Sequence, residues 1–282
     1  MMTTRGGDSV TGRVRIGTQG WNYAAWVGPF YPDGTRPADF LSLYGQAFDT
    51  VEVDSTFYAI PPVNSVRGWA ARTPEDFVFA LKLPREITHE RRLRGAWDEV
   101  ELFLERARLL GPKLGPVLVQ LGPDFLPSEL DALEAFLPAL PRDVRFAVEV
   151  RHHRWARADV LPDLLSLLAE HNVALTLTDG RWITREVMTE LALRPTADFH
   201  YVRWMGPNRD LTDFSHIQID RSEETAAWTG VLSEAPPRGI DVFGYMNNHF
   251  AGHSPASARD LQRRLGITPV EPGRLGEQIS LF

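Results

Sequence analysis

The chain has 282 residues, of which 43% are hydrophobic and 24% charged, and its formal net charge is −7. Such a composition is ordinary for a globular protein, and the length fits one large α/β domain or two smaller ones. The negative net charge argues against a protein that coats nucleic acid, although it permits a local basic cleft. Because the chain has no cysteine, disulfides, thiolate metal sites and a cysteine nucleophile are excluded.

The first eleven residues are polar and glycine-rich, with no apolar signal segment. No uninterrupted apolar run is long enough to cross a bilayer. We therefore expect a cytoplasmic protein with no membrane partner.

Short apolar runs alternate along the chain with longer segments of helical period. The predicted strands are residues 14–18, 50–54, 77–83, 117–121, 145–151, 174–178, 199–204 and 241–247. The predicted helices are residues 37–48, 63–72, 97–110, 128–140, 159–171, 184–191, 222–234 and 255–265.

Strict alternation of strands and helices favours a parallel sheet, and eight repeats close naturally into a (β/α)₈ barrel of the TIM type. We predict this α/β barrel over residues 14–266, after a leader of residues 1–13 and before a loose tail of residues 267–282. The alternative is an open doubly wound sheet, but no glycine-rich dinucleotide turn follows the first strand.

Alternation within the strands predicts which side chains enter the barrel. In the fifth strand Ala147, Glu149 and Arg151 share one face, opposite the apolar Phe146 and Val148. The same period places further polar side chains near the carboxyl ends of other strands: Glu52, Asp54, Lys82, Gln120, Thr176, Arg203 and Asn247. In TIM-type barrels that end carries the active site. The competing interpretation is a plug of ion pairs that merely neutralise one another.

We assign candidate roles from side-chain chemistry. The cations Lys82, Arg151 and Arg203 suit an anionic group such as phosphate. Glu52 or Glu149 is the candidate general base or metal ligand, and Asn247 is an orienting donor. The candidate substrate-binding residues are Trp21, Tyr23, Tyr58, His89, Gln120, Asp179, Tyr201 and Asn248.

Several of these assignments have structural alternatives. The aromatic residues after the first strand can stack on a sugar or base, or simply pack over the barrel. The arginine-rich run at residues 84–94 can grip phosphates, or form a solvated face. Asp179 stands just before Gly180 and can be a turn residue.

A divalent metal is a further possibility for the barrel mouth. Its candidate ligands are the carboxylates and imidazole of Glu52, Asp54, Glu149, Asp179 and His89. No closely spaced pair of ligands supports a metal site, so the sequence does not decide whether the mouth binds a metal. No serine nucleophile elbow or phosphate-binding P-loop is present either.

Ordered segments along almost the whole chain together resemble the YecE-like family, a widespread group of uncharacterised proteins. They include Gly20-Trp21-Asn22-Tyr23, Phe30-Tyr31-Pro32, Ser55-Thr56-Phe57-Tyr58, Thr88-His89, Gln120-Leu121, Glu149 with Arg151, Tyr201 with Arg203, and Tyr245 with Asn247-Asn248. The resemblance implies a TIM-type barrel similar in shape to endonuclease IV and xylose isomerase, but fold does not fix chemistry.

The sequence departs from the family pattern at three places. The pattern has histidine before glycine after the seventh strand, where this chain has Met205-Gly206. It commonly has asparagine at the position of Asp54, and proline at the position of Gly122. The missing histidine puts in doubt any mechanism that would use it as an acid, base or ligand.

The last five residues, Gln278-Ile279-Ser280-Leu281-Phe282, resemble the pentapeptide with which bacterial replication and repair proteins bind the DNA sliding clamp. Leu281 and Phe282, together with Ile279, are the expected apolar anchors, and Gln278 is the expected hydrogen-bonding residue. The alternative is an apolar terminus that packs against the barrel.

The leading hypothesis is an enzyme of DNA replication or repair, recruited by the clamp and acting on a phosphate-bearing substrate such as a nucleotide or DNA. The first alternative is an enzyme of small-molecule metabolism, such as a sugar or sugar-phosphate isomerase or lyase. The second is a barrel that binds a ligand without catalysis.

Overall fold

The structure, a computed structural model, describes residues 11–207 and 210–276. Eight strands form in this part of the chain: β1 (Val14–Gln19), β2 (Thr50–Val53), β3 (Val78–Lys82), β4 (Leu114–Gln120), β5 (Phe146–Glu149), β6 (Ala174–Asp179), β7 (Phe199–Trp204) and β8 (Asp241–Met246). Each lies at a predicted strand, with ends that differ by at most a few residues. They pair in parallel and in sequence order, and β8 closes onto β1. The predicted (β/α)₈ barrel is confirmed.

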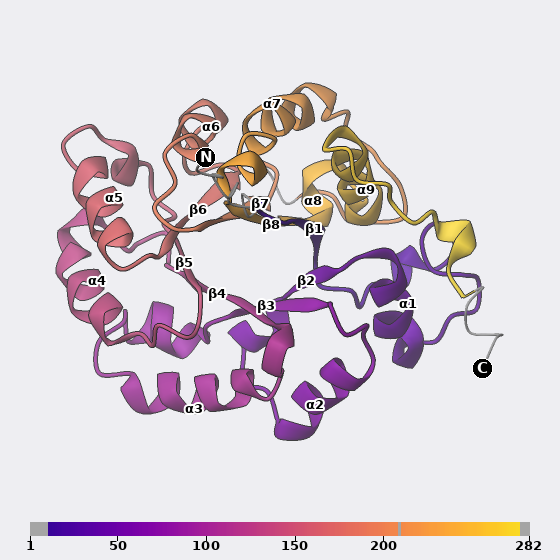
Figure 1. Cartoon of the computed structure of the whole chain (residues 1–282), viewed down its shortest axis with the longest axis horizontal. Coiled ribbons are helices and arrows are strands. Elements are labelled where there is room, and N and C mark those ends of the chain that lie inside the picture. Colours follow the sequence, from indigo (N-terminus) through magenta and orange to yellow (C-terminus); the bar gives the residue numbers. More distant parts are fainter. Residues whose placement is uncertain (1–10, 208–209, 277–282) are drawn as a thin grey trace, which may run out of the picture.

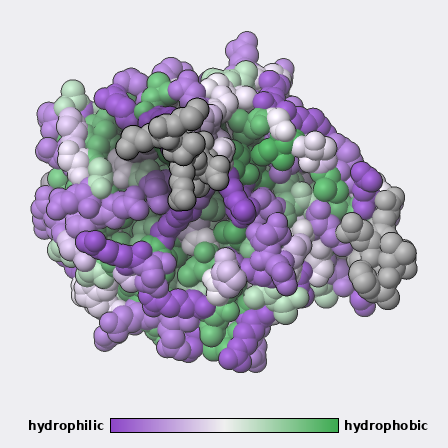
Figure 2. All heavy atoms as spheres, viewed as in Figure 1, coloured by the Kyte–Doolittle hydropathy of each residue, from purple (hydrophilic) through white to green (hydrophobic). Residues whose placement is uncertain are grey.

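Helices surround the strands on all sides (Figure 1). They are α1 (Phe40–Ala47), α2 (Val63–Ala71), α3 (Trp97–Arg108), α4 (Leu130–Phe136), α5 (Leu161–Glu170), α6 (Arg185–Ala192), α7 (Ser222–Leu232), α8 (Asn248–Ala251) and α9 (Ser254–Arg264). All eight predicted helices are present, and α8 is an addition. Hydrophilic side chains dominate the face seen in Figure 2, with hydrophobic patches between them. No helix in the described ranges is long and apolar enough to span a bilayer.

The core divides into two clusters, as the alternation within the strands predicts. One cluster fills the barrel interior and includes Ala80, Ala147, Tyr201 and Tyr245. The other cluster lies between the outer face of the strands and the helices. Small side chains on β3 and β5 leave room in the interior for the two tyrosine rings, whose centroids are 5.2 Å apart. Large polar side chains can therefore occupy the layer above them.

Strand register brings the polar strand ends to similar heights in the barrel. Gln19 of β1 pairs with Glu52 of β2, and Gln120 of β4 pairs with Glu149 of β5. Because all strands run in the same direction, these residues gather at one end of the barrel. This end, at the carboxyl ends of the strands, is called the mouth below.

Two local elements did not follow from periodicity. Residues Glu86–Glu90 form one π-helical turn, and Asn248–Ala251 form the short α8. The side chain of Asn247 accepts a hydrogen bond from the backbone nitrogen of His249 and so caps α8. Elements of four or five residues are too short to produce a helical repeat in the sequence.

Gly244 on β8 tests the close packing outside the barrel. An added Cβ would lie 2.7 Å from the Trp204 ring and 2.8 Å from the Ile16 side chain. We expect Gly244→Ala to lower the free energy of unfolding by about 1–3 kcal/mol in urea titrations. Gly230→Ala is the control, because an added Cβ at this position in α7 would meet nothing within 4 Å. This substitution is expected to raise the free energy of unfolding by about 0.4–1 kcal/mol. Equal effects of the two substitutions would contradict this account.

Candidate functional site

Arg203 of β7 lies at the centre of the mouth and is almost completely buried. Its Nε and Nη2 atoms donate to the two carboxylate oxygens of Glu52, at 2.9 and 2.7 Å. Its Nη1 atom donates to Glu149 at 2.6 Å and to Gln120 at 3.2 Å. The hydroxyl of Tyr201 donates to Glu52 at 2.7 Å. One guanidinium thus joins β2, β4, β5 and β7 across the barrel.

Glu149 links this buried centre to the rim of the mouth. While one of its oxygens accepts from Arg203, the other accepts a short hydrogen bond from Nε of Arg151. Burial alone would raise the pKa of Glu149, but Arg151 and Arg203 lower it to about 2. Glu149 is therefore an ionised residue that positions two guanidinium groups, rather than a general base near neutral pH.

Glu52 has a different electrostatic environment. Burial raises its pKa above the ordinary value, the charge of Arg203 opposes the rise, and Asp54 adds to it. Asp54 begins the turn after β2, is about a third exposed, and lies 3.8 Å from Arg203. Among the described residues, Glu149 is therefore paired with two guanidinium groups, whereas Glu52 and Asp54 share the guanidinium of Arg203.

Lys82 at the end of β3 is 6% exposed. Within residues 11–207 and 210–276 its ammonium makes no ion pair or hydrogen bond, and it lies 3.7 Å from the centre of the Phe57 ring. Burial and the charge of Arg203 lower its pKa to about 8. His89 packs edge-on against the same Phe57 ring, and burial followed by the charge of Lys82 lowers the pKa of His89 to about 4. His89 is thus neutral at pH 7.

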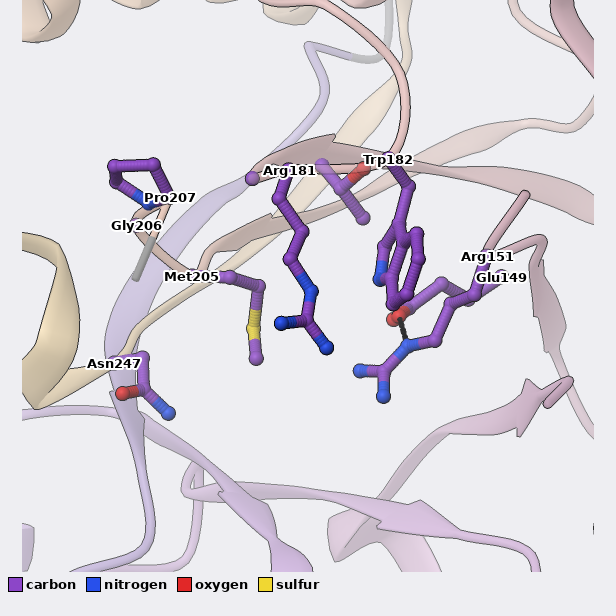
Figure 3. A pocket seen from close by; sticks show the side chains of 10 residues that line it. Glu149, Arg151, Arg181, Trp182, Met205, Gly206, Pro207 and Asn247 are labelled. Atoms are coloured by element: carbon purple, nitrogen blue, oxygen red, sulfur yellow. Dashed lines mark hydrogen bonds and ion pairs between the residues drawn. The ribbon is translucent and has the colours of Figure 1, made fainter. Parts of the chain in front are cut away.

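A small hollow of about 40 Å³, partly open to solvent, lies beside this cluster. Its lining residues are Glu149, Arg151, Thr178, Gly180, Arg181, Trp182, Met205, Gly206, Pro207 and Asn247. The guanidinium groups of Arg151 and Arg181 point into the same space (Figure 3). Asn247 borders that space, and its amide nitrogen donates to Gln19 at 2.7 Å.

The structure brings most of the predicted catalytic residues together. Glu52, Glu149, Arg151 and Arg203 form one hydrogen-bonded cluster with the predicted Gln120 and Tyr201. Lys82 lies near enough to this cluster for the charges of Arg203 and Arg151 to lower its pKa. Asn247 lies at the hollow. Internal ion pairs are therefore present, as the plug interpretation expects, but they do not include Lys82.

Other predicted residues serve the surrounding structure. The Asp179 carboxylate accepts from Arg185 at 2.9 Å and from Trp228 at 2.8 Å, both on the helices outside the barrel. The side-chain oxygen of Asn248 accepts from the nitrogen and hydroxyl of Ser254. Tyr58 is 81% exposed. The structure does not bring these three side chains into the charged cluster.

The aromatic loop after β1 mostly packs over the barrel. Trp26 is fully buried and lies between other rings. Trp21 contacts Trp69 edge-on, with ring centroids 6.1 Å apart. The hydroxyl of Tyr23 donates to the backbone oxygen of Gln19, and burial and then Asp54 raise its pKa to about 12. The charges of Asp54 and Glu52 both act on Tyr23, so this residue lies near the mouth carboxylates.

The arginine-rich run after β3 is neutralised by acidic residues. Its four arginines pair with carboxylates as follows: Arg85 with Glu90, Arg91 with Glu86 and Glu99, Arg92 with Asp124 and Glu129, and Arg94 with Glu129 and Asp131. The solvated-face interpretation describes this run better than a phosphate grip.

The metal candidates do not gather in space. Among the described residues, no three His, Asp or Glu side chains come together as a metal-binding group. The two buried glutamates instead direct their oxygens at guanidinium groups. The clamp-motif residues Gln278, Ile279, Leu281 and Phe282 lie outside the described residues.

Arg181, Trp182 and Phe57 were not singled out from the sequence. Arg181 and Trp182 follow β6 directly, after Asp179-Gly180. A position just beyond the carboxyl end of a barrel strand is itself a signal for a site residue. Asp179, two residues before Arg181, was the predicted site residue instead. Phe57 belongs to the family segment Ser55-Thr56-Phe57-Tyr58, but its contact with Lys82 is not apparent from spacing.

A closed parallel barrel with ionisable side chains at the carboxyl ends of its strands defines a TIM-type barrel protein with its candidate site at the mouth. Residues 15–278 match the family described as "Protein of unknown function DUF72", and the chain belongs to that family. The predicted resemblance to the YecE-like proteins is thereby confirmed.

Two curated relatives carry the family description UPF0759. The chain is 34% identical over 169 residues to UPF0759 protein YecE of Escherichia coli (strain K12), and the match covers 60% of each chain. It is 26% identical over 287 residues to UPF0759 protein YunF of Bacillus subtilis (strain 168), covering 95% of this chain and all of that one. A crystal structure of a DUF72 family protein from Thermotoga maritima shares the fold, with a TM-score of 0.72 and 24% identity, over 90% of this chain and 99% of that one.

The low pKa of Glu149 predicts a pH dependence of stability. A carboxyl whose pKa falls from 4.5 to about 2 on folding stabilises the protein fully above about pH 4.5, and loses this contribution as the pH falls toward 2. The contribution is on the order of 3 kcal/mol. We expect the difference in unfolding free energy between the wild type and Glu149→Gln to shrink as the pH is lowered from 7 to 3. Urea titrations at several pH values measure it, with Glu75→Gln at an exposed position as control. The same change with pH in both variants would contradict this account.

Proposed function

We propose that this protein is an enzyme that acts on a phosphate-bearing substrate, a nucleotide or DNA, at the mouth of the barrel. The observation that carries the proposal is the pair of guanidinium groups, from Arg151 and Arg181, that face one hollow (Figure 3). Guanidinium groups bind phosphate oxygens with paired, charge-assisted hydrogen bonds.

The charge balance of the mouth supports an anionic substrate. Arg203 and Arg151 together offset Glu52 and Glu149. The positive charges of Lys82 and Arg181 then remain, and the negative charge of Asp54 opposes them. In the described part of the chain Arg181 has no acidic partner, and its guanidinium lies over the neighbouring Trp182 ring. The mouth is thus locally positive in a chain whose net charge is negative.

The positioning of the groups supports catalysis over simple binding. Buried ionisable groups whose pKa values move in opposite directions are typical of active sites. The pKa of Glu52 rises, whereas the pKa of Glu149 falls to about 2. Glu52 and Asp54 are the carboxyl groups suited to proton transfer, and Asn247 is suited to orient a substrate by its amide.

The tail supplies the second part of the proposal. Residues 278–282 carry the spacing of glutamine and apolar anchors described above, and a peptide of this type binds in an extended form to a groove on its partner. Recruitment by the DNA sliding clamp would explain how an acidic protein reaches DNA without a general attraction to it.

Replacing Arg181 tests the phosphate site. We expect Arg181→Gln to weaken binding of a nucleoside monophosphate or a short oligonucleotide about tenfold, because one charge-assisted hydrogen bond to phosphate is lost. Calorimetry measures the affinity. The probes are inorganic phosphate, nucleoside monophosphates, sugar phosphates and 5′-phosphorylated single-stranded and double-stranded oligonucleotides.

The matched control is Arg108→Gln, which removes the same charge where Arg108 pairs with Asp143, away from the mouth. It should leave the affinity unchanged. Failure of all these probes to bind the wild type, or an equal loss of affinity in both variants, would overturn the phosphate site.

Alanine at Gln278, Leu281 and Phe282 tests recruitment. We expect the wild type to bind the sliding clamp of its own source with micromolar affinity, and the triple variant to show no binding in calorimetry, because the apolar anchors supply most of the affinity. Phosphate binding by the triple variant should be unchanged. Lack of clamp binding by the wild type would overturn the proposed recruitment, but it would not affect the proposed phosphate site in the barrel.

A further inference from the structure

Arginine makes up almost all of the basic residues in this chain. Of its 30 basic side chains, 28 are arginines and two are lysines, Lys82 and Lys113. Arginine stays protonated at all ordinary pH values, whereas a buried lysine can lose its proton and become a nucleophile. The two lysines therefore offer a chemistry that the rest of the basic set lacks, and their surroundings decide which of them can use it.

Lys113 has a structural role. Its ammonium donates to the backbone oxygens of Ala70 and Thr73, at 2.6 and 2.7 Å, and to the Thr73 hydroxyl at 3.2 Å. These contacts hold the end of α2 against the amino-terminal end of β4. All three of its protons are engaged, so its amine is not placed to attack a ligand.

Lys82 has the opposite surroundings. Its ammonium rests on the Phe57 ring and, within the described ranges, is not held by any carboxylate or carbonyl. The two buried carboxylates of the mouth are occupied elsewhere, since Glu52 binds Arg203 and Tyr201, and Glu149 binds Arg203 and Arg151. The backbone of Lys82 is fixed by Thr56, whose hydroxyl donates to its oxygen at 2.8 Å and accepts from its nitrogen at 3.0 Å. The backbone of Lys82 is thus held in place, while its amine has no acceptor among the described residues.

We propose that Lys82 is a nucleophile that forms a Schiff base with the aldehyde of a phosphate-bearing sugar held at the barrel mouth. This inference rests on the proposed phosphate site and names the substrate class more closely. The shared chemistry is an open-chain sugar aldehyde with a phosphate group. It occurs in free sugar phosphates and at positions of DNA that have lost a base.

The step balances without an oxidant or a cofactor. The nitrogen lone pair attacks the carbonyl carbon, a C–N bond forms, and the carbonyl oxygen takes up a proton to give a carbinolamine. Loss of the remaining nitrogen proton and of the hydroxyl group as water gives the imine. Asp54 is placed to exchange these protons, because it is part-exposed and its strongest described contact is a long one to Arg203. Arg151 and Arg181 hold the phosphate.

The electrostatics favour the reactive form of the amine. Burial, then Arg203, and more weakly Arg151, lower the pKa of Lys82 to about 8, although Asp54 and Glu52 partly oppose the shift. Roughly a tenth of the amine is then unprotonated at pH 7, against about one part in 3,000 for an ordinary lysine. A lysine kept only to bind phosphate would gain nothing from losing its charge.

Borohydride trapping tests the Schiff base, because reduction converts the imine into a stable secondary amine. The probes are a single-stranded oligonucleotide with one abasic site, and free 2-deoxyribose 5-phosphate. We expect a covalent adduct with at least one probe, mapped by peptide mass spectrometry to Lys82, with a yield that rises between pH 7 and pH 9. Which of the probes reacts distinguishes damaged DNA from a free sugar phosphate as the source.

Two variants of equal charge serve as comparison. Lys82→Arg keeps the cation but cannot form an imine, so the adduct should fall at least tenfold. Lys113→Arg should form it as the wild type does. An adduct mapped to Lys113 or to the amino terminus, or an undiminished adduct in folded Lys82→Arg, would overturn the proposal. The mapping on the wild type decides the matter even if Lys82→Arg does not fold.

A probe without an aldehyde separates the two proposals. An oligonucleotide with a tetrahydrofuran in place of the abasic sugar keeps the phosphates but cannot form an imine. Binding of this probe, weakened by Arg181→Gln, with no trapped adduct from either aldehyde, would reject the Schiff base and leave the phosphate site standing. Absence of both binding and adduct would reject the two together.

Discussion

The guanidinium of Arg203, held between Glu52 and Glu149 inside the barrel, is the interaction on which the mouth depends. Two carboxylates with almost no exposed surface are tolerated only because that cation and further hydrogen bonds compensate their charge. Removal of one partner of such a buried pair leaves an uncompensated charge, at a cost of about 3–5 kcal/mol. The small side chains Ala80 and Ala147 lower in the barrel make the arrangement possible, since they leave the interior to long polar side chains from other strands.

This internal pairing determines what the rest of the mouth offers to a ligand. Because Arg203 occupies both glutamates, Lys82 is left against an aromatic ring with a lowered pKa, and Arg181 faces the hollow with no described acidic partner. Glu149 in turn fixes the direction of Arg151. A cluster that looks like a neutral plug when charges are counted therefore leaves the cations of Lys82 and Arg181 outside its internal ion pairs, within the described part of the chain.

The fold, the side chains of the mouth and the tail of this protein bear on three separate questions: its architecture, its reaction and its location. The match to DUF72 and the likeness to solved members define an architecture that supports many chemistries. The proposed reaction depends on individual side chains at strand ends. The clamp motif, if it functions as proposed, decides only where the barrel works. The proposed reaction at the mouth and the proposed recruitment by the tail are physically independent, so either can stand without the other.

The sequence by itself determined the barrel and much of its polar mouth. Periods of two and of 3.6 residues are local, so they predicted eight strands and eight helices, and they placed Glu52, Glu149 and Arg203 toward the interior. Tertiary structure alone decided the partners. The carboxylate of Asp179 turns outward to Arg185 and Trp228, while Arg181, two residues later, faces the hollow. Lys82 meets Phe57 because β3 lies beside the turn after β2. Such choices depend on closure of the barrel, which brings together residues that are distant in sequence, and no local period encodes them.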